Sequence, residues 1–546
     1  MNVDKMQTKL ASWSQDQDFK FDDIYNLLYD EDWLRRAYRS VESNSGARTA
    51  GVDRQTMGDF EEDLGENLDS LTKELKSQSF DPKPVRRTYI PKGDDEERPL
   101  GIPTIKDRIV QEALRMVLEP IYETDFSDDS FGFRPNRSTH DAIMSVRNSI
   151  VPAQTYKPWV LDLDVKGFFD NVDHQILEQI IQNQITDQKM RDLIWEFLKA
   201  GIMEDGEYRH SMLGTPQGGI VSPLLANVYL NELDQWVKQW TDLTIQEKTK
   251  RRDGGKGNWH YVRYADDFLL LTNGTKGRAE KIMERVEDFL DEELNLTLSD
   301  EKSELDHAED GFSFLGYDLK VKTESGGVQR IISKDAERDI IAKVRKATDG
   351  NTNVSIRAKM KAVDAVLRGW ANYYRYATNA GSVFDRIQYK SWHMMTRWMA
   401  EKLKCSRKEL VGHRLDGTDP LLMNGVTLTK IAEMSAVRSK SHYRHDHPYL
   451  EGKNTGWENL PQEQPWLANT EERVGWKDTR WKALERDNWT CQECGANLER
   501  RAPHVHHQRP RSGYENPEEG NRLRNLVSLC RGCHQQVESS REYAHR

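Results

Sequence analysis

The chain contains 546 residues, and because a single hydrophobic core stops growing at about 250–300 residues, we expect several domains. No apolar run reaches the roughly 18 residues that span a bilayer, and the first residues form neither a signal peptide nor a basic leader. These features exclude the membrane-spanning class and predict a soluble protein of the cytoplasm.

Charge is distributed unevenly along the chain, whose formal net charge is −11. Residues 1–80 contain 10 basic and 17 acidic residues, and residues 280–310 contain 3 and 13. Residues 331–405 contain 15 basic and 7 acidic residues interleaved with aromatic rings, which suits a surface that follows phosphates. The acidic excess elsewhere fits a solvated face or an adaptation to high salt, and the sequence leaves both explanations open.

Hydrophobic periodicity predicts the elements in chain order. Amphipathic helices are expected in residues 1–80, then strands at 85–91 and 98–103 joined by a charged turn, and a helix at 107–122. Further strands are expected at 159–165 and within 261–272. Helices are expected at 278–294, 335–347 and 355–403, and residues 406–470 are polar and loop-rich.

Two apolar strand patterns carry carboxylates that an inert core strand would avoid: WVLDLDV from position 159 and YVRYADDFLLLT from position 261. Asp266 and Asp267 fall at a strand-to-strand turn. Because neighbouring residues of a strand point to opposite faces, one of them can point at a metal site and the other toward its periphery. The dipeptide alone also fits an ordinary β-turn.

The third carboxylate comes from the earlier strand, where Asp162 and Asp164 share one face. Nucleotide polymerisation needs two Mg²⁺ ions held by hard oxygen ligands, which predicts Asp164, Asp266 and Asp267 as catalytic metal ligands. The spacing from Asp164 to Phe169 resembles a motif in which an aromatic ring closes the site against a ribose 2′-hydroxyl and so favours dNTPs. We also expect Asp170 and Asp173 to cap the following helix.

Seven motifs in a fixed order carry a family resemblance over residues 50–320. They are RRTYIPKGDDEERPLGIPTIKDRIVQEAL, FSDDSFGFRPNRSTHDAI, the Asp164 motif, LGTPQGGIVSPLLANVYLNELD, YADD, LNLTLSDEKSEL and FSFLGYDL. This series resembles the reverse-transcriptase blocks of group II intron-encoded proteins. The resemblance implies a multidomain α+β fold, with a right-hand polymerase of fingers, an antiparallel palm sheet and a helical thumb.

The same resemblance implies roles for individual side chains around the incoming dNTP. Arg98 and Lys92 would neutralise its triphosphate. Gln217 would pack against its sugar and base, beside Phe169. Lys302 would act as general acid toward the pyrophosphate leaving group.

The basic segment after the palm contains GWANYYRYA, which resembles the maturase domain, or thumb, of the same family. The resemblance implies that this segment binds intron RNA. Its candidate phosphate contacts are Arg338, Lys343, Arg345, Lys346, Arg368 and Arg375. The rings of Trp370, Tyr373 and Tyr374 fit either an RNA surface or the core of a helical bundle, and the sequence does not decide between the two.

Four of the five cysteines form two Cys-x-x-Cys pairs near the C-terminus. Cys491, Cys494, Cys530 and Cys533 have the number and spacing of a tetrahedral structural Zn²⁺ site. A module of this size has too little core to fold without such a metal. The fifth, Cys405, is expected to be a small buried apolar residue.

The residues between and after these pairs resemble the four-cysteine form of the HNH nucleases, which have a small zinc-stabilised ββα-metal fold. The resemblance implies that His507 is the general base and that Asn525 orients it. It implies that His506 and His534 hold a divalent ion, such as Mg²⁺, against the scissile phosphate. A zinc ribbon that binds DNA, or an inactive nuclease, remains an alternative.

The implied domains are an N-terminal helical extension (1–80), fingers and palm (81–325), thumb (326–405), a DNA-binding linker (406–470) and the nuclease (471–546). The implied protein acts with its intron RNA, target DNA and dNTPs, without a membrane, in splicing and target-primed reverse transcription. It could dimerise, and it would associate with the prokaryotic nucleoid. A domesticated or defence-associated reverse transcriptase, or an RNA-binding splicing cofactor with a vestigial polymerase, is the alternative.

Overall fold

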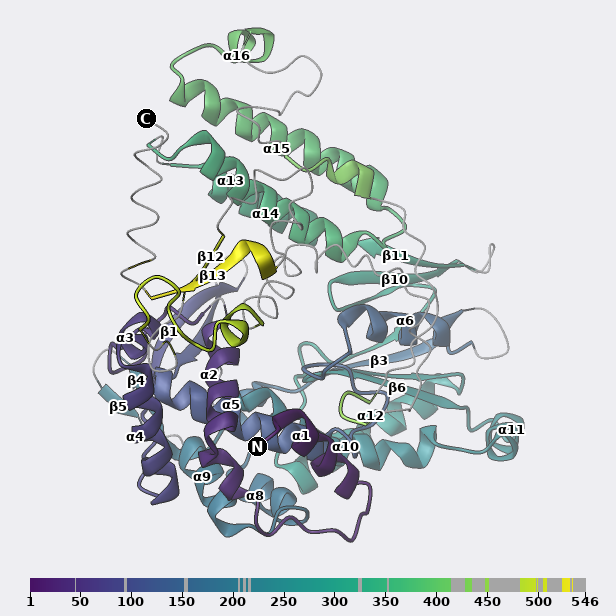
Figure 1. Cartoon of the computed structure of the whole chain (residues 1–546). Coiled ribbons are helices and arrows are strands. Elements are labelled where there is room, and N and C mark those ends of the chain that lie inside the picture. The colour runs from purple at the N-terminus through teal and green to yellow at the C-terminus, as the bar shows by residue number, and fades with distance from the viewer. Residues whose placement is uncertain are drawn as a thin grey trace.

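The computed structural model (Figure 1) describes most of the chain between residues 1 and 533. The described residues are 1–44, 46–92, 96–151, 156–204, 207–209, 213–214, 218–322, 327–350, 353–413, 428–434, 447–450, 482–496, 498, 504–507, 523–530 and 533. Within them, the side chains at positions 91, 92, 96, 98, 207–209, 412, 413, 504, 507 and 524 are not described.

The N-terminal residues form helices, as the periodicity predicted, and several of these helices pack on one long central helix. These helices are α1 (Val3–Trp13), η1 (Tyr25–Tyr29), α2 (Glu31–Glu42), α3 (Met57–Glu62), α4 (Leu64–Lys76) and the central α5 (Ile105–Tyr122). The buried Trp33 of α2 donates its indole N–H to the carbonyl of Ala113 at 3.1 Å. This bond fixes the extension against the rest of the fingers.

The fingers sheet has the strand order β2-β1-β4-β5. Its strands are β1 (Val85–Lys92), β2 (Glu96–Ile102), β4 (Ile202–Glu204) and β5 (Glu207–Arg209). The two strands expected on either side of a charged turn are β1 and β2, which pair antiparallel, while β1 pairs parallel with β4.

The palm sheet has the order β6-β7-β3-β8, and all its neighbouring strands are antiparallel. Its strands are β3 (Trp159–Asp164), β6 (Trp259–Tyr264), β7 (Asp267–Thr272) and β8 (Glu304–His307). The helices around it are α6 (Thr139–Ile150), α7 (Phe168–Asn171), α8 (His174–Gln182), α9 (Gln188–Lys199), α10 (Ser222–Thr241), α11 (Ile245–Asp253) and α12 (Lys276–Leu294).

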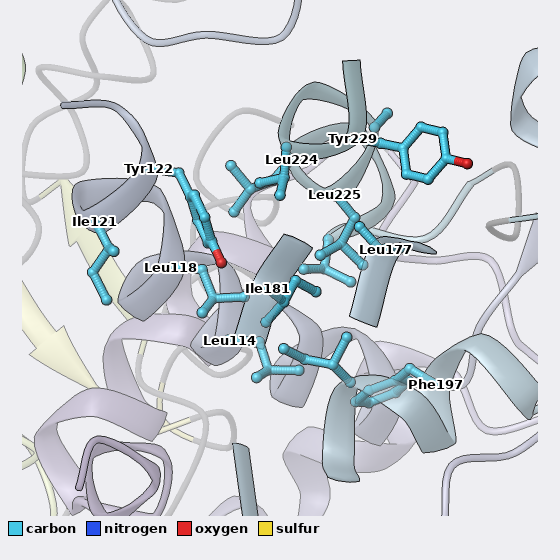
Figure 2. Close-up of a cluster of buried hydrophobic side chains, with 14 of the residues drawn as sticks. Leu114, Leu118, Ile121, Tyr122, Leu177, Ile181, Phe197, Leu224, Leu225 and Tyr229 are labelled. Atoms are coloured by element: carbon cyan, nitrogen blue, oxygen red, sulfur yellow. The ribbon is translucent and has the colours of Figure 1, made fainter. Parts of the chain in front are cut away.

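Alternation along these strands separates two hydrophobic cores. One face carries Leu161, Leu163, Tyr261, Phe268 and Leu270, which belong to a first core shared with the fingers helices and α10. Figure 2 shows a part of this core, where side chains of α5, α8, α9 and α10 converge. The other face carries Val160, Val262, Leu269 and Leu271, which belong to a second core shared with α6 and the thumb.

The thumb consists of a three-stranded sheet and long helices; the helices are drawn at the top of Figure 1, and the strands β10 and β11 lie below them. The sheet has the order β11-β10-β9, with β9 (Phe312–Phe314), β10 (Tyr317–Lys322) and β11 (Gly327–Ile332). The helices are α13 (Lys334–Thr348), α14 (Ile356–Tyr374), α15 (Ala380–Lys402), α16 (Arg407–His413) and η2 (Ile431–Met434).

Residues 355–403 are mostly helical, as expected, and they form two helices because the chain between them pairs with β11. The Thr378 amide donates to the carbonyl of Arg330 at 2.6 Å, and the Asn379 side chain accepts from the Ile332 amide at 2.9 Å. These bonds compete with helix continuation at a place without a glycine or proline.

The C-terminal module contains β12 (His504–His507) paired antiparallel with β13 (Leu526–Leu529), preceded by η5 (Leu523–Asn525). It has a small core of its own around Leu484, Cys491, Leu498 and Leu529. Across the described ranges, each helix is too short or too polar to cross a membrane.

Candidate active site

Three carboxylates lie together at one end of the palm sheet. Tyr264 pairs with Asp267, so that Ala265 and Asp266 form a two-residue hairpin turn between β6 and β7. Ala265 has a φ of 59°, as the first residue of such a tight hairpin turn favours. On the neighbouring strand, Asp164 is the register partner of Asp267. The turn that the sequence predicted therefore places its aspartates beside the aspartate of β3.

A cavity of about 610 Å³ opens at this point. Asp164, Asp266 and Lys302 line it, and the Lys302 ammonium donates to the Asp164 carboxylate at 3.0 Å. Its remaining lining residues are Glu97, Pro99, Leu100, Phe133, Val165, Gly167, Phe168, Phe169, Gly218, Gly219, Ser222 and Pro223. The cavity thus brings together residues from six of the seven ordered motifs, the first of which contributes strand β2 of the fingers.

The electrostatics of this cluster favour a bound cation. Burial, together with the nearby Asp266 and Asp164, raises the pKa of Asp267 to about 7, although Lys302 opposes the shift. Burial, followed by Asp267 and other neighbouring carboxylates, raises the pKa of Asp162 to about 8. Mg²⁺ prefers hard oxygen ligands, and this cluster contains more carboxylates than cationic side chains. The residues present therefore fit the metal that the family implies.

A buried ion pair, which was not predicted from the sequence, lies next to the hairpin turn and donates a hydrogen bond to it. Arg263 and Asp234 of α10 are both fully buried, and the guanidinium donates to the carboxylate at 2.7 and 2.5 Å. Arg263 also donates to the carbonyl of Ala265 at 2.9 Å and to Asn227 at 2.9 Å. Burial alone would lower the pKa of Arg263, but Asp234 and Tyr261 raise it above its ordinary value. A charge inside an apolar strand was the available signal for this pair.

At two glycines beside the site, neighbouring backbone approaches so closely that no side chain fits. A Cβ on Gly132 would lie 2.3 Å from the amide nitrogen of Ala265 in the catalytic turn. Gly218 has a φ of +112°, and a Cβ there would lie 2.2 Å from the carbonyl oxygen of Gly101 in β2. The first contact lets the catalytic turn pack directly on the GFRP segment that contains Gly132. The second lets the PQGG segment that contains Gly218 pack directly on strand β2 of the fingers.

Of the other residues predicted around the nucleotide, the structure describes the side chain of Phe169 alone. Phe169 lies in α7, which begins after Gly167 at a φ of 54°, and it lines the cavity. Lys92 and Arg98 lie on the paired strands β1 and β2, but their side chains are not described. Gln217 lies outside the described residues.

The predicted helix caps are half right. Asp173 is the N-cap of α8 and accepts from the amides of Gln175 and Ile176 at 2.8 and 3.2 Å. Asp170 instead lies inside the short helix α7, so the prediction that it caps the next helix is wrong. The extra turn that follows Gly167 displaced it from the cap position.

The predicted RNA contacts fall on two different environments. Arg338, Lys343, Arg345 and Lys346 are exposed along α13. Arg368 is half-buried and forms an ion pair with Asp364 of the same helix. Arg375 is half-buried beside Tyr376. The rings of Trp370, Tyr373 and Tyr374 pack against the second core, which settles the open alternative in favour of a core position.

The four cysteines of the C-terminal module converge, with their sulfur atoms all within 4.8 Å of one another. Burial would raise the pKa of Cys491, but backbone amides of Cys494, Cys530 and Glu493 lower it to about 6. The Cys530 amide donates to the Cys491 sulfur at 3.3 Å. Four thiols held in this way fit a tetrahedral Zn²⁺ site.

Replacing Cys491 with serine is expected to remove the metal from the module. We expect zinc measured by atomic emission to fall from about one ion per chain to a small fraction of that. Polymerisation should persist, because Cys491 belongs to a separate small core. Cys405→Ser is the matched control, since Cys405 lies outside the cluster. Equal zinc loss in both variants would contradict the site.

Three of the four predicted nuclease residues lie on or directly before the paired strands β12 and β13. His506 is buried on β12 opposite Val527 of β13, and the buried Asn525 directly precedes β13. His507 pairs with Leu526 through its backbone, and its side chain is not described. His534 lies outside the described residues.

Three protein families match the chain in order. Residues 90–319 match the reverse transcriptase (RNA-dependent DNA polymerase) family, residues 338–415 the maturase-specific domain of group II introns, and residues 491–540 the HNH endonucleases. The chain is 38% identical over 354 residues to protein YkfC of Escherichia coli, covering 61% of this chain and 92% of that protein.

Similarity also extends to proteins whose names refer to introns. The chain is 33% identical over 475 residues to the group II intron-encoded protein LtrA of Lactococcus lactis, covering 73% of this chain and 78% of LtrA. It is 30% identical over 453 residues to the putative COX1/OXI3 intron 2 protein of Saccharomyces cerevisiae, covering 70% of this chain and 52% of that protein. With its reverse transcriptase, maturase and endonuclease domains in this order, the chain belongs to the group II intron-encoded proteins.

Proposed function

We propose that this reverse transcriptase polymerises dNTPs at Asp164, Asp266 and Asp267 while its thumb holds intron RNA and its nuclease nicks the target DNA. The nick exposes the 3′-hydroxyl that the polymerase extends, and the same RNA contacts assist splicing. The observation that carries the proposal is the shared cavity of Asp164, Asp266, Lys302 and Phe169. In this cavity the carboxylates proposed to bind the cations lie together with the ring of Phe169 and with Lys302, the proposed proton donor.

Each side chain of the polymerase site has a proposed task. Asp164, Asp266 and Asp267 would hold two Mg²⁺ ions, which supply charge neutralisation of the triphosphate and activation of the primer hydroxyl. Phe169 excludes a ribose 2′-hydroxyl, and Arg98, Lys92 and Gln217 contact the nucleotide. Lys302, largely exposed and paired with Asp164, can turn its ammonium toward the leaving pyrophosphate.

RNA binding is proposed for the exposed basic face of the thumb. Arg338, Lys343, Arg345 and Lys346 offer four cations along α13, and Arg368 and Arg375 extend the set onto α14 and its C-terminal end. The four exposed cations of α13 suit a phosphate backbone, whose binding releases counterions. This face therefore supplies basic charge that the acidic chain lacks overall.

The nuclease task is proposed for the C-terminal hairpin. His507 would activate water, Asn525 would orient that histidine, and His506 and His534 would hold a divalent ion at the scissile phosphate. The Zn²⁺ site keeps the hairpin folded. The module also contacts the fingers, because the Arg39 guanidinium of α2 lies 6.0 Å from the centre of the Trp489 ring.

The finer organisation is also proposed. The domains are the extension (1–80), fingers and palm (81–325), thumb (326–405), a DNA-binding linker (406–470) and the nuclease (471–546). The active form is a ribonucleoprotein on chromosomal DNA in the cytoplasm of a prokaryotic cell, and it could contain two copies of the chain.

Separation of the two chemistries tests this proposal. His507→Ala is expected to lower DNA nicking at least about a hundredfold, because a general base contributes 10²–10⁴ in rate. Primer extension on an RNA template should stay at the native level. Asp266→Asn is the reciprocal control, losing extension and retaining nicking. Joint loss of both activities in His507→Ala would contradict independent sites.

A further inference from the structure

One side of the thumb helix α15 combines basic side chains with an exposed aromatic ring. The residues spaced so that they lie along this side are Arg386, Tyr389, Lys390, His393 and Arg397. Tyr389 is 65% exposed, and Arg386, Lys390 and Arg397 are exposed as well. Between positions 386 and 397 the sequence contains no carboxylate. We call this surface the α15 face.

The exposed ring of Tyr389 is held by its neighbours. Its centre lies 4.2 Å from that of the His393 ring, with the two planes inclined at 68°, and the His393 and Trp392 rings pack edge to face with their centres 4.8 Å apart. Arg407 of α16 donates to Nδ1 of His393 and lies 5.1 Å from the centre of the Trp392 ring. Because Tyr389 already packs against a ring that is itself held, it loses little conformational freedom when a ligand stacks on it.

The α15 face borders the helix for which RNA binding is proposed. Arg386 donates to the two carboxylate oxygens of Glu337 on α13, at 3.1 and 2.7 Å, and the two helices run side by side in Figure 1. This ion pair holds α15 against the helix that carries the exposed Lys343 and Lys346. Cations that can follow a phosphate backbone therefore lie next to a ring that can stack on a base.

The chemistry of the α15 face suits a nucleotide whose base is unpaired. In an A-form RNA duplex the bases are stacked on one another, and side chains cannot read the deep, narrow major groove. An unpaired base can leave the stack and lie on an aromatic ring, while basic side chains contact the adjacent phosphates. Cations alone would bind single-stranded and duplex RNA without this distinction. The ring of Tyr389 is the group on this face that can tell the two forms apart.

We propose that Tyr389 stacks on an unpaired base of the bound RNA, with Lys390 and Arg397 at the flanking phosphates. The exposed cations of α13 supply affinity for RNA of either form, and Tyr389 selects single-stranded segments. The inference rests on the proposed binding of RNA by the thumb. It adds the form of RNA that the thumb selects and the residue that makes the selection.

Ring substitutions in the full chain test this selection. The probes are a labelled oligoadenylate of about 12 nucleotides and an RNA duplex of about 12 base pairs, a length within the usual single-strand site sizes. Fluorescence anisotropy measures their binding after excess unlabelled primer–template has occupied the polymerase site. We expect Tyr389→Leu to weaken binding of the single strand by roughly 5–100-fold, as loss of one base–aromatic stack would, and to leave duplex affinity within about twofold.

Tyr389→Phe is the matched control, because it keeps the ring and removes the hydroxyl alone. It should bind both RNAs as the native chain does. Both variants should keep the native melting temperature, since the ring is largely exposed. Equal loss of affinity for the two RNAs in Tyr389→Leu, or native affinity for both, would overturn the stacking role. Altered sedimentation of the RNA-free Tyr389→Leu chain with native RNA affinity would also overturn it, and would assign the α15 face to a protein contact.

A double variant on α13 separates this inference from the proposed function on which it rests. Lys343→Ala combined with Lys346→Ala should weaken both RNAs and lower the slope of log affinity against log salt by about 1–2, because two phosphate contacts are lost. Native affinity of this double variant for both RNAs would contradict RNA binding by α13. Weakened binding by the double variant together with native binding by Tyr389→Leu would contradict the stacking role alone.

Discussion

Replacing Asp266 with asparagine is expected to lower Mg²⁺-dependent dNTP incorporation on an RNA template at least about a thousandfold. The substitution preserves shape but removes one charge from the cavity that Asp164 and Lys302 share. A thousandfold loss corresponds to about 4 kcal/mol of transition-state stabilisation, within the range of a strong electrostatic contribution. Single-nucleotide extension of a labelled primer measures the effect.

Asp306→Asn is the matched control for this prediction. Asp306 lies on β8 of the same sheet, and burial raises its pKa as well, but it does not line the cavity. We expect it to retain incorporation within about twofold, as a surface substitution away from the site would. Comparable losses at Asp266 and Asp306 would mean that removing any carboxylate from the sheet lowers the rate, whether or not it lines the cavity.

Replacing Asp234 with alanine is expected to lower the free energy of unfolding by about 3–5 kcal/mol, because it leaves the buried Arg263 without its counter-charge. Tyr261 would also lose its acceptor, since its hydroxyl donates to Asp234 at 2.7 Å. Denaturant unfolding followed by near-ultraviolet circular dichroism measures the change. Polymerisation should fall too, because Arg263 holds the carbonyl of Ala265 in the catalytic turn.

Two controls separate stability from positioning in this second prediction. Glu31→Ala removes the exposed partner of Arg35 on α2 and should cost about 0.5 kcal/mol or less. The double variant Asp234→Leu with Arg263→Met replaces the buried pair by apolar groups and should recover much of the stability. It should remain slow in polymerisation, since methionine cannot donate to Ala265. Full recovery of both properties would argue against a positioning role for Arg263.

Much of the palm could be predicted because its chemistry is local in sequence. Apolar strands carrying Asp164, Asp266 and Asp267 conflict with their surroundings, and such conflicts mark functional sites. The zinc site could also be predicted from the two Cys-x-x-Cys pairs, since metal ligands have characteristic spacings. The fold class, the enzyme class and the family follow from these motifs and are confirmed by the comparisons.

The contacts that position the site were not predictable in the same way. Arg263 and Asp234 are 29 positions apart, and their partnership depends on which face of β6 meets α10. Periodicity predicted that residues 355–403 are mostly helical, but it did not locate the break between α14 and α15. The pairing of Asn379 with β11 that ends the helix is a tertiary contact, which local propensity does not encode.

The second core extends without interruption from the palm strands to the thumb helices. Val160 and Leu269 of the sheet belong to it, as do Met360 of α14 and Phe384 of α15. Palm and thumb should therefore gain and lose their structure together, as one cooperative folding unit. A fragment ending between the reverse transcriptase and maturase matches would expose half of this core to water and invite aggregation. Nucleic acid bound along the thumb would, by the same linkage, stabilise the sheet that carries the catalytic carboxylates.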